Sequence, residues 1–429
     1  MSIHTRARTR VPKRTILRLL GPGLVAGAAD DDPSGVATYS QAGAQFGFGL
    51  LWTVVLTYPF MVAIQVVSAR IARATGEGIV ANMRTAFPRW AMVWIVVLVL
   101  AANTINIAAD LAAMGAATSL VVGGHPALYA VLLGAFCVVL EVLVPYRRYA
   151  PILKGLTIVL FFYVGTVLTV HIPWEQAALG ALLPQLTWNA DYIVTVVAVF
   201  GTTISPYVFF WQAAEEVEDM KLDGHVRALR DYHGHIKPVL KRIGVDTALG
   251  MGFSISIAAC IMLTTAATLH QQGITNIETS AQAAEALRPL AGPLTFFLFA
   301  LGILGTGLLA VPVLAGSAAY AVAEAFDWRS SLELKPLEAR GFYSIVAGST
   351  IIGALIGLSP LDPIKMLFWT AVINGVVAVP VMAVMMRLVS SRKVMGPVAA
   401  GPVLRIGGWA ATGVMALVVV AMLATWAMA

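Results

Sequence analysis

Three consecutive carboxylates, Asp30, Asp31 and Asp32, stand inside the apolar run 16–43. A charged side chain at the centre of a membrane helix costs about 2.5 to 3.5 kcal/mol on insertion scales, so a retained one suggests a function. Pro33 follows at once, and proline disfavours helix at the residue before it, so the helix is expected to unwind at Asp31 and Asp32 and to restart at Pro33. Carboxylates beside freed carbonyls suit hard cations, which makes this break a candidate metal site.

A simpler role for Asp32 is that of N-cap of the second half-helix. That role leaves Asp30 and Asp31 unexplained as additional charge in the membrane. The metal-site interpretation, with Asp32 as principal ligand and Asp31 and Asp30 as an acidic shell, accounts for all three.

The apolar run 190–213 is also interrupted, by the segment Gly201-Thr202-Thr203-Ile204-Ser205-Pro206-Tyr207. A lone proline kink is common in membrane helices and carries little weight. Paired breaks in corresponding helices of two halves, however, indicate the midplane site of a transporter built from inverted repeats. We therefore expect Thr202 and Ser205 to form the wall opposite Asp32.

The composition of the 429-residue chain is that of a membrane protein. Charged residues make up 12% and hydrophobic residues 59%, with a mean hydropathy of +0.83, whereas a soluble domain has about 25% charged residues. This excludes a soluble enzyme, a disordered chain and a nucleic-acid binder, since the basic residues behind the net charge of +6 fall between apolar runs. Cys137 and Cys260 lie within apolar runs, so neither a disulfide framework nor a zinc site is expected.

Eleven apolar runs predict an all-α polytopic protein. They fall at 16–43, 48–71, 90–121, 126–144, 152–170, 190–213, 243–269, 293–325, 341–358, 363–387 and 404–428. The breaks in the first and sixth runs favour a LeuT-like fold in one domain covering 1–429. Its expected parts are a cytoplasmic tail at 1–15, a first repeat at 16–170, an inverted second repeat at 190–387, and an extra helix at 404–428.

The distribution of basic residues predicts the topology. With the N-terminus in the cytoplasm, 26 of the 28 Lys and Arg residues fall on the cytoplasmic side, and only Arg288 and Lys365 fall outside. A missed or invented span would invert every later loop. We therefore expect a multi-pass cell-membrane protein with its N-terminus inside and its C-terminus outside.

The motifs around both breaks resemble the natural resistance-associated macrophage protein (NRAMP) family of divalent metal transporters. Gly21–Gly23 matches the family's Gly-Pro-Gly, Asp32–Thr38 its Asp-Pro-Gly-Asn with Val-Ala-Thr, and Ser205–Tyr207 its Met-Pro-His. The resemblance covers nearly the whole chain. It implies a transporter rather than an enzyme, with a divalent ion as substrate and no cofactor.

The resemblance also implies the metal ligands, with two departures from the family. Asp32 keeps the carboxylate, and the carbonyls of Ala29 and Thr202 match the backbone ligands by spacing. Gly35 stands where the family has Asn, and Ser205 where it has Met. Thioether sulfur favours softer ions, whereas hydroxyl, carbonyl and carboxylate oxygens suit Mg²⁺, Ca²⁺ and Mn²⁺.

A larger and more acidic site suits Mg²⁺, which usually keeps several of its waters. With Asp30 and Asp31 added and the Asn and Met side chains lost, the sequence most resembles the NRAMP-related magnesium transporters. A proton-coupled Mn²⁺/Fe²⁺ transporter remains the alternative.

The proton route of the family is altered. Tyr207 and Gln212 occupy its two histidine positions, and Ala113 that of a glutamate on the third helix; histidine titrates near neutral pH, whereas tyrosine and glutamine do not. Asp110 remains and could still bind a proton. The pattern predicts weak or absent proton coupling.

Two polar groups elsewhere leave alternatives open. Asn103 and Asn106 share a helix face with Asp110, which fits either a pore lining or interhelical hydrogen bonds. The acidic group that ends the sixth run is either a cation funnel or an ordinary solvated face; it comprises Glu215, Glu216, Glu218 and Asp219.

Two other functions fit less well. A sodium-coupled transporter of organic solutes would present bare half-helix N-termini to a substrate carboxylate, which Asp32 would repel. An intramembrane aspartyl protease needs a second aspartate motif, but the other candidate, Asp362, falls in a predicted outer loop. The expected partners are the divalent ion and the lipid bilayer, with no nucleic acid and no obligatory protein partner.

Overall fold

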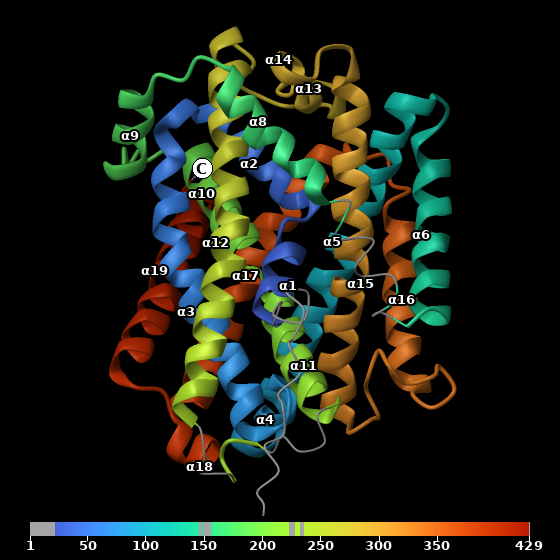
Figure 1. Cartoon of the computed structure of the whole chain (residues 1–429), viewed down its shortest axis with the longest axis vertical. Helices are drawn as coiled ribbons and strands as arrows, with labels where there is room; N and C mark the ends of the chain where they lie inside the picture. The colour runs from blue at the N-terminus through green and yellow to red at the C-terminus, as the bar shows by residue number, and fades with distance from the viewer. Residues whose placement is uncertain are drawn as a thin grey trace, which may run out of the picture.

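The computed structural model describes residues 22–145, 148, 155, 157–222, 228–231 and 236–428. The predicted tail at 1–15 and Gly21 of the Gly-Pro-Gly motif lie outside these residues. All regular secondary structure in the described part is helical, as predicted (Figure 1).

Helices are found in each of the eleven predicted apolar runs. The first and sixth runs each contain two helices, α1 and α2, and α10 and α11. In chain order the helices are α1 (Pro22–Asp30), α2 (Pro33–Phe46), α3 (Leu51–Thr75), α5 (Arg89–Val122), α6 (Pro126–Leu143), α8 (Phe161–Thr169), α10 (Ala190–Thr203), α11 (Pro206–Leu222), α12 (Ile236–Thr268), α15 (Thr295–Phe326), α16 (Arg340–Ile356), α17 (Pro363–Ser390) and α19 (Pro402–Met428).

Shorter helices connect these elements at the two ends of the molecule. In Figure 1, α9 (Trp174–Leu182), α13 (Ser280–Glu285) and α14 (Arg288–Ala291) lie at one end, and α4 (Ile79–Ala86) and α18 (Arg392–Met395) at the other.

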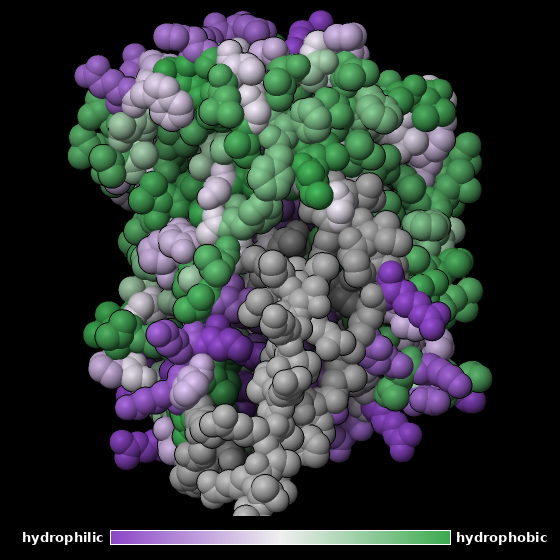
Figure 2. Space-filling model, viewed as in Figure 1, coloured by the Kyte–Doolittle hydropathy of each residue, from purple (hydrophilic) through white to green (hydrophobic). Residues whose placement is uncertain are grey.

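The helices are long and apolar enough for a multi-pass membrane protein. In the described part of the chain, eight helical stretches meet the length and hydropathy of a membrane span, and Pro33–Thr75 among them contains both α2 and α3. Two further apolar helices, Ile158–Thr169 and Arg340–Ile356, are shorter. Apolar side chains cover much of the visible surface, while polar ones gather towards its two ends (Figure 2). Exposed side chains such as those of Trp90, Leu168 and Val403 are therefore suited to contact lipid.

Both predicted helix breaks are present. α1 ends at Asp30 and α2 begins at Pro33, while α10 ends at Thr203 and α11 begins at Pro206. In each case proline occupies the first position of the second half-helix, where its missing N–H costs nothing. α1 and α11 lie in the lower half of Figure 1, and α2 and α10 above them, so the two breaks lie near mid-height.

Small residues allow α1 to run close beside α12. A Cβ on Gly23 would lie 2.7 Å from the Thr247 backbone, and one on Gly27 would overlap the Gly250 carbonyl. Such close backbone approach is typical of helix pairs in membranes. The packing brings the end of α1 against the middle of α12.

We expect Gly27→Ala to lower the thermal unfolding midpoint in detergent. The added methyl meets backbone, so α1 must shift, and overpacking of this kind costs about 1–3 kcal/mol. Gly413→Ala is the matched control, because a Cβ on Gly413 in α19 meets nothing within 4 Å. The same helix-propensity gain applies to both variants. Equal midpoints would contradict the close packing.

Candidate functional site

Asp32 caps α2 through one of its carboxylate oxygens. Its backbone is extended, with φ −80° and ψ 171°. Its Oδ1 accepts hydrogen bonds from Ser34 Oγ at 2.6 Å and from the Gly35 N–H at 2.7 Å. The predicted N-cap is thus confirmed, and it uses only half of the carboxylate.

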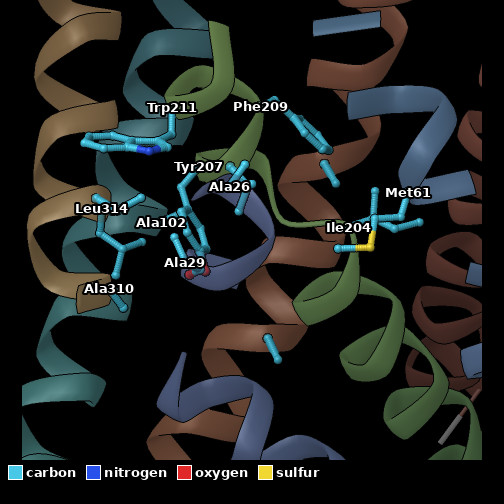
Figure 3. Packing of buried hydrophobic residues seen from close by; sticks show 14 of the residues in the cluster. Ala26, Ala29, Met61, Ala102, Ile204, Tyr207, Phe209, Trp211, Ala310 and Leu314 are labelled. Atoms are coloured by element: carbon cyan, nitrogen blue, oxygen red, sulfur yellow. The ribbon is translucent and has the colours of Figure 1, made fainter. Parts of the chain in front are cut away.

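The second oxygen of Asp32 faces α5 and α11. Asp32 Oδ2 accepts from Asn106 Nδ2 at 3.0 Å, and the Tyr207 hydroxyl lies 3.4 Å away. The same hydroxyl donates to the Ala29 carbonyl at 3.1 Å, and Figure 3 shows Tyr207 reaching towards Ala29. One hydroxyl proton cannot serve both acceptors at once. Tyr207 therefore bridges two of the predicted ligands, although its sequence position had suggested only a lost histidine.

The α10–α11 break places Thr202 next to α2. Thr202 Oγ1 lies 3.5 Å from Ser34 Oγ. A Cβ on Gly35 would lie 3.4 Å from Thr202 Oγ1 and 3.6 Å from Asp32 Oδ1. Asp32, Gly35 and Thr202 therefore come together, as the sequence predicts.

Ser205 is oriented differently from the expected wall. Its hydroxyl donates to the Thr202 carbonyl at 2.6 Å and contacts the Gly201 carbonyl at 3.0 Å. Within the described ranges no hydrogen bond joins Ser205 to Asp32. Ser205 thus contacts the site through its hydrogen bond to the carbonyl of Thr202, and this carbonyl is itself an expected ligand.

Asp30 and Asp31 contact α12 through one shared hydroxyl. Ser254 Oγ lies 3.0 Å from Asp30 Oδ2 and 2.9 Å from Asp31 Oδ1. Nowhere in the described part of the chain do three His, Cys, Asp or Glu side chains converge as a metal cluster. The three neighbouring carboxylates therefore have different partners: Asp32 contacts α5 and α11, whereas Asp30 and Asp31 contact α12.

The positions of the altered proton route are all buried. Asp110 is fully buried, and in the described part of the chain neither of its carboxylate oxygens has a hydrogen-bond partner. It lies one helical turn beyond Asn106 on α5. Gln212 donates to Thr247 Oγ1 at 2.9 Å, joining α11 to α12, and Ala113 packs in the core. Of these four positions, only Asp110 carries a carboxylate that could hold a proton.

A further buried carboxylate was not expected. Glu141 on α6 accepts from Thr350 of α16 at 3.2 Å, and its other oxygen has no hydrogen-bond partner within the described ranges. The signal was available, because Glu141 is a lone carboxylate in the apolar run 126–144. The two asparagines of the polar stripe also differ: Asn106 binds Asp32, whereas Asn103 donates to the Leu314 carbonyl and to Ser317.

The acidic end of α11 is an ion-pair network. Glu216 and Asp219 lie 3.9 and 3.7 Å from Arg73 Nη1, and 4.0 and 3.6 Å from Arg242 Nη2. Arg73 belongs to α3 and Arg242 to α12. These two acids therefore tie three helices together.

The sequence model of the natural resistance-associated macrophage protein-like family matches residues 23–425. The chain belongs to the NRAMP family. Members of this family are transporters and not enzymes, which agrees with the absence of a second aspartate motif in the sequence.

Curated relatives cover most of this NRAMP protein. The divalent metal cation transporter MntH of Pectobacterium carotovorum is 28% identical over 410 residues, covering 93% of this chain and 92% of the relative. The protein of the same name from Klebsiella pneumoniae (strain 342) is 30% identical over 307 residues, covering 70% of each.

Two solved structures bear out the LeuT-like fold. The manganese transporter of Eremococcus coleocola, solved with an aromatic bis-isothiourea compound, has a TM-score of 0.73 at 16% identity, covering 96% of this chain and 88% of that one. Mhp1, a nucleobase-cation-symport-1 family transporter in a closed conformation, has a TM-score of 0.56 at 14% identity, covering 94% and 92%. At these identities the likeness concerns the fold alone.

Proposed function

We propose that this NRAMP protein carries hard divalent cations, Mg²⁺ and also Mn²⁺, into the cell with weak or no proton coupling. The observation that carries the proposal is the setting of Asp32. Its carboxylate is 1% exposed and is surrounded by hydroxyl and amide groups at the point where the helix is broken. Oxygen ligands suit Mg²⁺ and Mn²⁺.

The proposed ligands are the Asp32 carboxylate and the carbonyls of Ala29 and Thr202. Gly35 supplies no side-chain ligand where the family has an amide. Ser205 supplies oxygen where the family has sulfur, and its hydroxyl lies on the Thr202 carbonyl. Both departures favour an ion that keeps part of its hydration shell, as Mg²⁺ does. We therefore propose that the chain belongs to the branch of NRAMP-related magnesium transporters.

Asp30 and Asp31 add negative charge on the α12 side of the break. We propose that they attract the cation towards Asp32. We also propose the organisation that the sequence predicts. The two repeats cover 16–170 and 190–387, and an extra helix covers 404–428. The N-terminus lies inside the cell and the C-terminus outside.

Weak coupling is supported by the side chains that replace the titratable groups. Tyr207 donates to Ala29 and Gln212 donates to Thr247, so both positions make structural contacts. A proton-coupled Mn²⁺ transporter is the second candidate. It is favoured by the buried carboxylate of Asp110, which has no hydrogen-bond partner among the described residues.

A flux assay in liposomes tests selectivity and coupling together. The full-length protein is reconstituted with an internal pH dye, and Mg²⁺, Mn²⁺ and Ca²⁺ are added outside in turn. We expect Mg²⁺ and Mn²⁺ entry with acidification well below one proton per ion.

Protein-free liposomes measure the leak of each ion through the bilayer, and a proton ionophore is used to calibrate the pH dye. Mn²⁺ entry without Mg²⁺ entry, accompanied by about one proton per ion, would instead establish the second candidate. Absence of flux for every divalent ion would contradict the proposed function as a whole.

A further inference from the structure

The contact between α1 and α12 contains a second polar centre beside the Asp32 site. Asp30 and Asp31 are 3% and 5% exposed, and both carboxylates meet the same hydroxyl, that of Ser254. One oxygen of each carboxylate therefore lies within hydrogen-bond distance of this hydroxyl. Its partner on α12 differs from the partners of Asp32, which contacts Asn106 of α5 and Tyr207 of α11.

The hydrogen bonds of this centre are incomplete. Ser254 has one hydroxyl proton, so it cannot donate fully to two carboxylates. Asp30 Oδ1 and Asp31 Oδ2 are buried and have no hydrogen-bond partner among the residues that the structure describes. Buried acceptors without partners are rare in folded proteins, and each one calls for an explanation such as an unseen ion.

The charge of the centre is also unbalanced. No ion pair joins Asp30 or Asp31 to a Lys, Arg or His within the described ranges. α1 ends at Asp30, and the C-terminal end of a helix carries partial negative charge that favours cations. The negative charges of two carboxylates and of a helix C-terminus thus lie close together in a buried environment. Burying them without a cation costs free energy.

We propose that Asp30, Asp31 and Ser254 form a second binding station for a hard divalent cation, separate from Asp32. Two carboxylates match the charge of one divalent ion, and carboxylate and hydroxyl oxygens with water are ligands that Mg²⁺ and Mn²⁺ accept. The inference rests on the proposed function, because it assigns the second station to the transported ion.

The position of the station suggests its use. Further along α12, towards its Ile236 end, Asp246 accepts the Gly23 N–H at 2.8 Å. Carboxylate groups thus lie along the contact between α1 and α12, from the helix break to the beginning of α1. An ion leaving Asp32 on this side meets Asp30 and Asp31 next.

Counting the bound ions tests the proposal. Purified full-length protein in detergent is titrated with MgCl₂ by calorimetry, and bound Mn²⁺ is counted by the loss of its free electron paramagnetic resonance signal. We expect two ions per wild-type chain and one per Asp30→Asn/Asp31→Asn chain. Asp32→Asn is expected to retain one ion, held by the second station.

Ser254→Ala is the milder variant and guards against misfolding of the double variant. It keeps both carboxylates, so we expect about tenfold weaker binding of the second ion with an unchanged thermal midpoint. Asp231→Asn, at an exposed position, is the control and should bind two ions.

One ion per wild-type chain would overturn the second station. If the double variant then still bound that ion, Asp30 and Asp31 would have no part in binding; if it bound none, they would belong to a single site with Asp32. A wild-type chain that binds no divalent ion and moves none in liposomes would instead contradict the proposed function itself.

Discussion

Asp32→Asn is expected to abolish Mg²⁺ and Mn²⁺ uptake into liposomes. Asparagine keeps the shape of the side chain and an oxygen that can accept from the Gly35 N–H, so the cap of α2 survives. What it removes is the negative charge that meets the cation. Loss of an outer-shell partner already costs a metal site about 10–100-fold, so loss of the principal ligand should lower the uptake rate by more than about 100-fold.

A second variant separates the two roles of Asp32. Asp32→Ala removes both the charge and the cap, and it should lose uptake together with part of its thermal stability, since a lost N-cap costs about 0.5–2 kcal/mol. Asp231→Asn provides the same change at an exposed position and should transport normally. If Asp32→Asn kept its uptake while Asp32→Ala lost it, Asp32 would be a helix cap and not a ligand.

The two helix breaks could be predicted from the sequence because their cause is local. Pro33 and Pro206 each lack an N–H and restrict the residue before them, and both begin a half-helix. The polar residues beside each proline, in an otherwise apolar run, then indicate that the break is functional. Nothing from the rest of the chain is needed for this inference.

The directions of the side chains could not be predicted in the same way. Asp30 and Asp31 meet Ser254, more than 220 positions away in the chain, because Gly23 and Gly27 allow α1 to pack closely against α12. Tyr207 has a sequence position that suggests a lost proton group, yet its hydroxyl lies between Ala29 and Asp32. Such contacts depend on how distant helices pack, and a single sequence does not contain that information.

Restoring the two missing family side chains is expected to change the ion preference. In the double variant Gly35→Asn/Ser205→Met, the new amide lies beside Asp32 and Thr202, where a Cβ just fits at 3.4 Å from Thr202 Oγ1. The Ser205 hydroxyl no longer covers the Thr202 carbonyl, and a thioether takes its place. Sulfur and a tighter ligand set favour softer ions that lose water more readily than Mg²⁺.

We expect Mn²⁺ and Cd²⁺ to compete against Mg²⁺ about tenfold better than in the wild type, which corresponds to about 1.4 kcal/mol. The measurement is inhibition of Mg²⁺ flux by each ion in liposomes. Ser256→Met, at an exposed position on α12, introduces the same thioether away from the site and should leave the order of ions as it is. If the double variant also kept the wild-type order, ligand type at these two positions would not set the preference, and selectivity would have to come from the carboxylates alone.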